Sequence, residues 1–129
     1  MQVLIVDNSR LIIERLKLIL SESANIIGAY GAVSFKEGAC FLTEIKLQVV
    51  LIDSGLPATE SIDLLKKVKE VNPDTRVIVL LNGEDDHLQL KFKSSGADFF
   101  FDKYHEFEKI PAAINAIAID IKQNGINGK

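Results

Sequence analysis

The sequence predicts an α/β protein in which five strands form one parallel sheet covered by helices on both faces. Short apolar runs alternate with segments of helical periodicity along the chain, as in repeated βα units. The run Val49-Val50-Leu51-Ile52 is apolar without alternation, as expected for a strand that is covered on both faces. No internal repeat or low-complexity tract interrupts this pattern. A doubly wound sheet follows from these observations.

The first two βα units occupy residues 2 to about 45. Residues 2–6 form the first predicted strand, and Ser9 after it is suited to cap a helix. We expect the second strand over residues 26–30. Ser34 and Glu37 then make a capping box for the second helix. The first helix has apolar residues spaced for one buried face, namely Leu11, Ile12, Leu16, Ile19 and Leu20.

The next two units begin with a strand over residues 49–53. Thr59 or Ser61 is the expected start of the helix that follows, and residues 72–73, Asn-Pro, end it. Residues 76–81 form the fourth predicted strand. The acidic run over residues 84–86 favours a helix N-terminus, and Gly96 is suited to end that helix.

The fifth unit consists of a strand over residues 97–102 and a helix over about 107–122. Right-handed crossovers between the five units give a doubly wound, flavodoxin-like three-layer sandwich with strand order 2-1-3-4-5. The last helix carries isoleucines spaced for one face, namely Ile110, Ile114, Ile117 and Ile121.

Length and composition fit a single domain over residues 1–123, followed by a flexible tail or linker start over 124–129. The net charge of -3 disfavours direct binding of nucleic acid.

Cys40 is the sole cysteine, which excludes an internal disulfide and agrees with a reducing compartment. Its helical surroundings predict a buried, unreactive thiol. The sequence shows neither a signal peptide nor an apolar stretch that could span a membrane, so we expect a cytoplasmic location without membrane association.

Polar residues follow three of the predicted strands directly. Asp7 and Asn8 follow the first strand, Asp53 ends the third, and Asp102 and Lys103 end the fifth. Ligands of open α/β sheets bind in the crevice outside the carboxyl ends of the strands. Acids, an amide and an ammonium group gathered there suit a divalent cation and a phosphoryl group.

These residues make the chain resemble a response regulator receiver domain of the CheY-like type, from residue 1 to about 122. Each motif is weakly specific alone, but their combined spacing in a βα chain of this length is typical of that family. The matching residues are Asp7, Asp53, Leu56-Pro57, Gly96-Ala97-Asp98 and Lys103.

The resemblance implies a phosphotransfer switch. Asp53 would accept a phosphoryl group from the phosphohistidine of a sensor histidine kinase or phosphotransfer protein. Asp7, Asp53 and the backbone carbonyl of Gly55 would bind Mg²⁺, and Lys103 would contact the phosphoryl oxygens. Phe100 falls where the family often has a switching aromatic residue. The expected function is a stand-alone receiver that signals by protein–protein interaction, with at most self-catalysed phosphotransfer and dephosphorylation.

Four positions depart from the family pattern, and the least important of them is Ser61, where glycine is frequent. Asn8 stands where a second acid is usual; its amide oxygen can still bind Mg²⁺, but one charge worth about 4 kcal/mol of gross attraction is missing. Weak Mg²⁺ binding is therefore expected, and Asn8 could equally be a simple turn residue. The switching Ser or Thr falls on Leu81, or on Asn82 with a shift of one residue. Tyr104 replaces the proline that often follows the lysine, so a cis peptide bond has no basis there.

The last helix also has a second set of apolar residues outside its core stripe. In the family, the last two helices and the fifth strand often mediate pairing, so this set suggests a homodimer or a downstream protein target. A helix that is simply well buried explains it equally. The residues are Ala113, Ala116 and Ile119.

Three other functions compete with the phosphotransfer switch. Asn8 and Leu81 favour a pseudo-receiver, a protein-binding module that works without phosphorylation. A flavodoxin shares the topology, but Asp7 would repel the flavin phosphate. A hydrolase of the haloacid dehalogenase type needs a second acid at the position of Ser9 and a cap domain for which the length leaves no room.

Overall fold

The structure is a computed structural model that describes residues 1–83 and 85–127. The strands are β1 (Gln2–Val6), β2 (Gly28–Ala32), β3 (Val49–Asp53), β4 (Arg76–Leu81) and β5 (Phe99–Asp102). The helices are α1 (Arg10–Leu20), α2 (Phe35–Glu44), α3 (Ala58–Val71), α4 (Asp86–Ser94), the short 3₁₀ helix η1 (Phe107–Lys109) and α5 (Ile110–Asn127).

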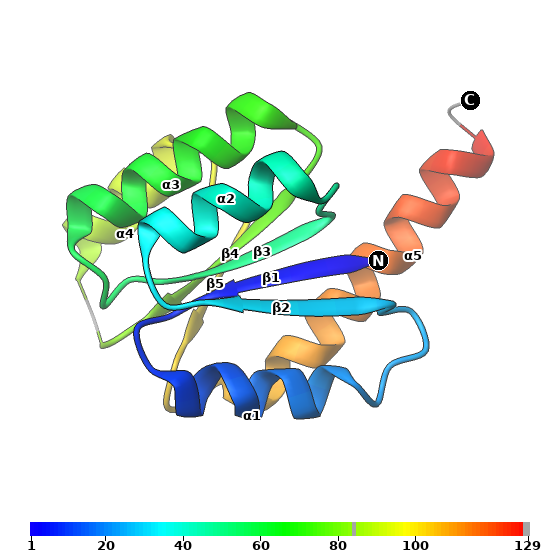
Figure 1. The fold of residues 1–129 in the computed structure, drawn as a ribbon, viewed down its shortest axis with the longest axis horizontal. Helices are drawn as coiled ribbons and strands as arrows, with labels where there is room; N and C mark the ends of the chain where they lie inside the picture. Colours follow the sequence, from blue (N-terminus) through cyan, green and yellow to red (C-terminus); the bar gives the residue numbers. More distant parts are fainter. Residues whose placement is uncertain (84, 128–129) are drawn as a thin grey trace.

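The sheet is parallel, with the predicted order β2-β1-β3-β4-β5. Figure 1 shows α2, α3 and α4 on one face of this sheet and α1 and α5 on the other. The flavodoxin-like three-layer sandwich is thereby confirmed. All strands run in one direction, so their carboxyl ends meet at one edge of the sheet.

Successive residues of each central strand face opposite layers because the side-chain period of a strand is two. Leu4 and Val6 of β1 pack in the core beneath α2, α3 and α4, together with the fully buried Phe92. Val3 and Ile5 pack in the core beneath α1 and α5. Both faces of the central strands are thus covered, which explains their uninterrupted apolar sequence.

Two strands begin later than the sequence predicts. β2 begins at Gly28 because its register places Gly28 opposite Gln2, whereas the N–H of Ile26 turns back to the Ser23 carbonyl. β5 begins after residue 98, since the N–H of Ala97 still bonds to the Phe92 carbonyl at the end of α4. Pairing with β1 thus sets the start of β2, and the end of α4 sets the start of β5.

Details of α1 and α2 also differ from the predictions. In α1, Ile13 is buried and Leu11 is 70% exposed, so the buried face is rotated from the predicted one. In α2, Gly38 and Leu42 face the core, and Cys40 is exposed instead of buried.

The starts of the third and fifth predicted helices differ as well. α3 begins directly after Pro57, whose fixed φ suits a helix N-terminus, and neither Thr59 nor Ser61 caps it. The final helical segment opens with η1, and α5 continues past residue 122 to Asn127. Residues 128–129 of the predicted tail lie outside the described residues.

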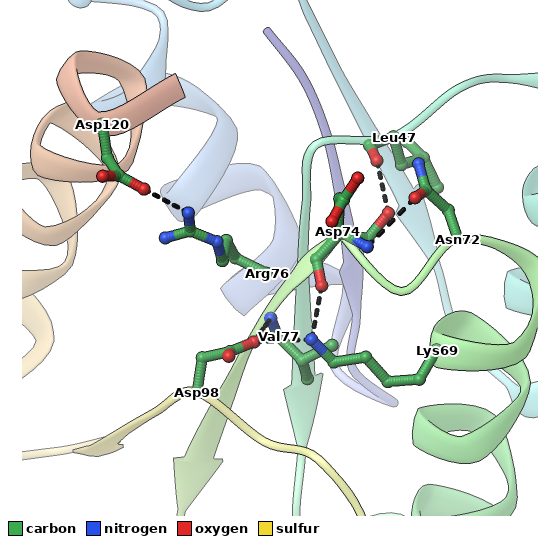
Figure 2. A network of polar contacts seen from close by, with 9 residues as sticks. Leu47, Lys69, Asn72, Asp74, Arg76, Val77, Asp98 and Asp120 are labelled. Carbon is green, nitrogen blue, oxygen red and sulfur yellow. Dashed lines mark hydrogen bonds and ion pairs between the residues drawn. The ribbon is translucent and has the colours of Figure 1, made fainter. Parts of the chain in front are cut away.

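Ion pairs and hydrogen bonds connect the amino-terminal end of β4 to α3 and α5, as Figure 2 shows. The Asp98 carboxylate accepts hydrogen bonds from the Val77 N–H and the Lys69 ammonium, each at 2.8 Å. Lys69 also donates to the Thr75 carbonyl at 2.6 Å, and Arg76 pairs with Asp120 of α5. This polar cluster lies at the end of the sheet opposite the carboxyl ends of the strands.

No helix in the described part of the chain is long and apolar enough to cross a membrane.

Candidate functional site

Asp7, Asp53 and Lys103 lie at the carboxyl edge of the sheet. Each ends or directly follows a strand, at a position whose side chain points to the same face as every second residue of that strand. Asp7 follows Val3 and Ile5 in phase, and Asp53 follows Val49 and Leu51 in the same way; these four apolar residues belong to the core beneath α1 and α5. Lys103 continues the phase of Phe99 and Phe101, which pack against that core as well. The period of two therefore directs all three charged side chains to the same face of the sheet.

The structure brings the predicted carboxylates and ammonium group into direct contact. Lys103 Nζ lies 2.8 Å from Asp7 Oδ2 and 3.3 Å from Asp53 Oδ2. Asp7 is completely buried, Asp53 is 1% exposed and Lys103 is 6% exposed. Two negative charges thus share one positive charge inside the protein.

Backbone and hydroxyl donors hold the two acids in place. The Ser9 N–H donates to Asp7 Oδ1 at 2.8 Å, and the Gly55 N–H donates to Asp53 Oδ1 at 3.0 Å. The buried Ser61 hydroxyl donates to the Asp53 carbonyl at 3.2 Å. Both carboxylates are therefore fixed by the turns that follow their strands.

Two pKa values in the cluster are raised, one by burial and the other by neighbouring charges. Burial raises the pKa of the Asp7 carboxyl, and its interactions with Lys103 and Ser9 oppose this shift without cancelling it. Burial alone would lower the pKa of Lys103, but contact with Asp7 and the charge of Asp53 raise it. Lys103 is therefore fully protonated at neutral pH, and the Asp7 site favours added positive charge.

Asn82, and not Leu81, reaches the acidic cluster. Leu81 is the last residue of β4, and its side chain packs against the core beneath α2, α3 and α4. Asn82 comes one residue later, so its side chain points to the opposite face from that of Leu81. Its Nδ2 lies 3.4 Å from Asp53 Oδ1. Of the two alternatives for the switching Ser or Thr position, Leu81 and Asn82, only Asn82 lies at the phosphoacceptor candidate.

The remaining predicted residues lie around this cluster. Phe100 is half-buried against the core beneath α2, α3 and α4, away from the acids. Gly55 is exposed at the turn after Asp53, and Asn8 is exposed beside Asp7. Glu84, which borders the site in sequence, lies outside the described residues.

The loop after β5 is held by carboxylates. Asp102 Oδ1 accepts from the N–H groups of Tyr104 and His105, both at 2.9 Å, and Glu106 Oε1 accepts from the Asp102 N–H at 2.8 Å. These bonds lower the pKa values of Asp102 and Glu106. Residues 1–83 and 85–127 contain no cis peptide bond, as the presence of Tyr104 in place of proline predicts.

The Ser61 contact has no counterpart among the sequence predictions, although a signal for it exists. Ser61 shares a helix face with Leu64, Leu65 and Val68, which are all buried. A hydroxyl on the apolar face of a helix needs a hydrogen-bond partner. That pattern indicates a contact with the neighbouring strand.

The donor set fits a hard divalent cation. Asp7 Oδ2 is buried and accepts no hydrogen bond of regular geometry in the described residues; its contact with Lys103 is an ion pair. Asp7, Asp53, the Asn8 amide and the Gly55 carbonyl offer oxygen ligands of the kind that Mg²⁺ binds. Only two of these candidate ligands are carboxylates, and within residues 1–83 and 85–127 no three His, Cys, Asp or Glu side chains are grouped so that they could hold a metal ion.

Comparison with known proteins assigns the family. Residues 3–115 match the family model described as "Response regulator receiver domain", and the chain belongs to this family. The receiver domain is a signalling domain of two-component systems and not a conventional enzyme. The flavodoxin and dehalogenase alternatives are thereby removed.

Individual relatives agree with this assignment. The virulence transcriptional regulatory protein PhoP of Salmonella typhimurium is 27% identical over 117 residues, covering 91% of this chain and 51% of that protein. The chain thus spans about half the length of the curated relatives it matches.

Two solved structures have the same fold. A CheY-like receiver from Methanospirillum hungatei is 22% identical, with a TM-score of 0.81 and coverage of 95% of this chain and 97% of that one. The BeF3-activated receiver domain of DrrB from Thermotoga maritima is 25% identical, with a TM-score of 0.72 and coverage of 90% and 95%.

Proposed function

We propose that this receiver domain accepts a phosphoryl group on Asp53 from the phosphohistidine of a sensor histidine kinase or a phosphotransfer protein. The observation that carries the proposal is the Lys103 ammonium, which lies 3.3 Å from Asp53 Oδ2 at the carboxyl edge of the sheet. A fixed cation beside a carboxylate can neutralise the charge of a phosphoryl group that arrives there.

In the transfer, an oxygen of the Asp53 carboxylate attacks phosphorus and forms an acyl phosphate. The P–N bond of the phosphohistidine breaks, and its electron pair stays with the departing imidazole. Lys103 stabilises the phosphoryl oxygens, while the Gly55 N–H holds the carboxylate in position. Mg²⁺, held by Asp7, Asp53, Asn8 and the Gly55 carbonyl, would supply further positive charge when bound.

Transfer of radiolabel from acetyl phosphate or a cognate kinase tests the proposal. The unmodified protein should take up label in the presence of Mg²⁺, and Asp53→Asn should not. The exposed Asp74→Asn serves as the matched control and should label normally. Absence of label at every Mg²⁺ concentration would refute phosphotransfer.

A pseudo-receiver is the second candidate, favoured by the burial of Asp53 and by the side chains at positions 8 and 81. Such a module would bind a protein partner without phosphorylation. Since the DrrB receiver is described as BeF3-activated, beryllofluoride separates the two candidates. The chain has no tryptophan, so amide NMR is the suitable readout. A Mg²⁺-dependent change on adding beryllofluoride supports phosphotransfer, and an unchanged spectrum supports the pseudo-receiver.

We further propose that the signal passes to a cytoplasmic protein target and that α4, β5 and α5 can pair two copies of the domain. Ile119 of α5 is 56% exposed, which leaves part of the second apolar set available. Sedimentation of the protein with and without beryllofluoride tests the pairing. The stand-alone arrangement stays a prediction, because the curated relatives are about twice as long as this chain.

A further inference from the structure

Asn82 covers the candidate phosphoacceptor. Its Nδ2 lies 3.4 Å from Asp53 Oδ1, and Asp53 is only 1% exposed although Asn82 itself is exposed. A Cβ added to Gly55 would lie 2.4 Å from the same Nδ2, so the amide rests directly on the turn after Asp53. The side chain of Asn82 therefore closes the Oδ1 side of the carboxylate.

The second carboxylate oxygen of Asp53, Oδ2, is covered by a side chain that is held more firmly than Asn82. Asp53 Oδ2 faces Lys103, which is buried, paired with Asp7 and tied through its N–H to the Leu81 carbonyl at 2.8 Å. Asn82 is followed by Gly83, whose φ of +95° belongs to a turn that most side chains avoid. A hydrogen bond of 3.4 Å is also long and therefore weak. Of the two side chains that cover Asp53, Asn82 is thus the one that can move away at a low cost in free energy.

We propose that the Asn82 side chain gates Asp53 and slows both the arrival and the loss of the phosphoryl group. This inference rests on the proposed function. In labelling, an Asp53 oxygen attacks the phosphorus of acetyl phosphate, the P–O bond to the acetyl group breaks, and acetate leaves with the electron pair. In hydrolysis, water attacks phosphorus, the P–O bond to Asp53 breaks, and inorganic phosphate and a proton are released.

The amide acts in both steps. Before transfer it occupies the approach to Oδ1, so the donor must displace it. After transfer its N–H donors are placed to bind a phosphoryl oxygen, which stabilises the acyl phosphate against attack by water. A carboxylate at this position would instead repel the incoming phosphate.

Variants of Asn82 test the gate through rates of labelling by acetyl phosphate and of subsequent loss of label. Asn82→Ala should accelerate both rates about twofold, the factor that corresponds to a weak hydrogen bond of ~0.5 kcal/mol. Asn82→Asp should label more slowly than the unmodified protein. Asn72→Ala, the same change at the opposite end of the sheet, should leave both rates unchanged.

A second readout needs no phosphoryl group. The side-chain amide resonances of Asn82 should shift when Asp53 is replaced by alanine, whereas those of Asn72 should stay in place. Normal labelling with unchanged rates in Asn82→Ala, or an Asn82 resonance that does not respond to Asp53→Ala, would overturn the gate alone. Failure of the unmodified protein to take up label would overturn the proposed function and the gate with it.

Discussion

The Lys103 ammonium lies 2.8 Å from the Asp7 carboxylate, and both groups are buried between the ends of β1 and β5. Lys103 also faces Asp53, so a single cation balances two acids. Removing one partner of a buried ion pair leaves an uncompensated charge, which costs far more than the loss of an exposed pair.

Replacing Lys103 by methionine should therefore destabilise the domain by about 3 kcal/mol. Urea denaturation at neutral pH without Mg²⁺ measures the change. Added Mg²⁺ should recover more stability in the variant than in the unmodified protein, because two unpaired carboxylates bind a cation more strongly than a neutralised pair. Lys93→Met on the exposed side of α4 is the control; an equal loss there would contradict the role given to Lys103.

Asp7→Asn should raise the stability of the metal-free protein at pH 7. Burial raises the pKa of Asp7, so the folded state binds its proton more tightly than the unfolded state does. The charged form therefore costs stability above the folded-state pKa, and this cost disappears as pH falls through that pKa to the ordinary value of 3.8. The advantage of Asp7→Asn should be largest above the folded-state pKa of Asp7 and vanish below 3.8, as thermal unfolding at several pH values would reveal.

Asn8→Asp should tighten Mg²⁺ binding and lower the stability of the metal-free protein. A third carboxylate adds attraction for the cation and adds repulsion toward Asp7 and Asp53 when no cation is present. Isothermal titration with Mg²⁺, followed by urea denaturation with and without the ion, measures both effects. Asn72→Asp adds the same charge at the far end of the sheet. If the two variants bound Mg²⁺ equally, Asn8 would not be a ligand position.

Asp98→Ala should cost about 1–3 kcal/mol, because the Val77 N–H loses its carboxylate acceptor and the Lys69 ammonium loses its ion pair. Asp98→Asn keeps an acceptor oxygen and should lose less. Chemical denaturation of the two variants gives the comparison. Phosphotransfer should be unaffected in both, since this cluster lies at the opposite end of the sheet; a change in labelling rate would show coupling between the ends.

Ser61→Ala should cost about 1 kcal/mol, because its buried hydroxyl donates to the Asp53 carbonyl. Thermal unfolding measures the change, and Ser94→Ala on the exposed part of α4 is the matched control. An unchanged melting temperature in Ser61→Ala would show that the hydrogen bond contributes nothing to holding the end of β3.

Much of the fold follows from local signals. The bounds of β1, β3 and β4 agree with the prediction, because these strands are covered on both faces and their apolar runs end at charged or turn-forming residues. The edge strands β2 and β5 start later than predicted, because the register with β1 sets the start of β2 and the end of α4 sets the start of β5. The exposed Leu11 shows the same limit for helices, since spacing alone leaves the orientation of a helix face open.

The sequence by itself determined the family, the strand order and the presence of Asp7, Asp53 and Lys103 at one edge, because residue type and strand ends are local properties. Only the tertiary structure decided which side chains meet. The phase of β4 sends Leu81 into the core and Asn82 to Asp53, and the packing of α3 brings Ser61 against the end of β3. A shift of one residue reverses the face of a strand, so contacts of this kind depend on a register that distant parts of the chain impose.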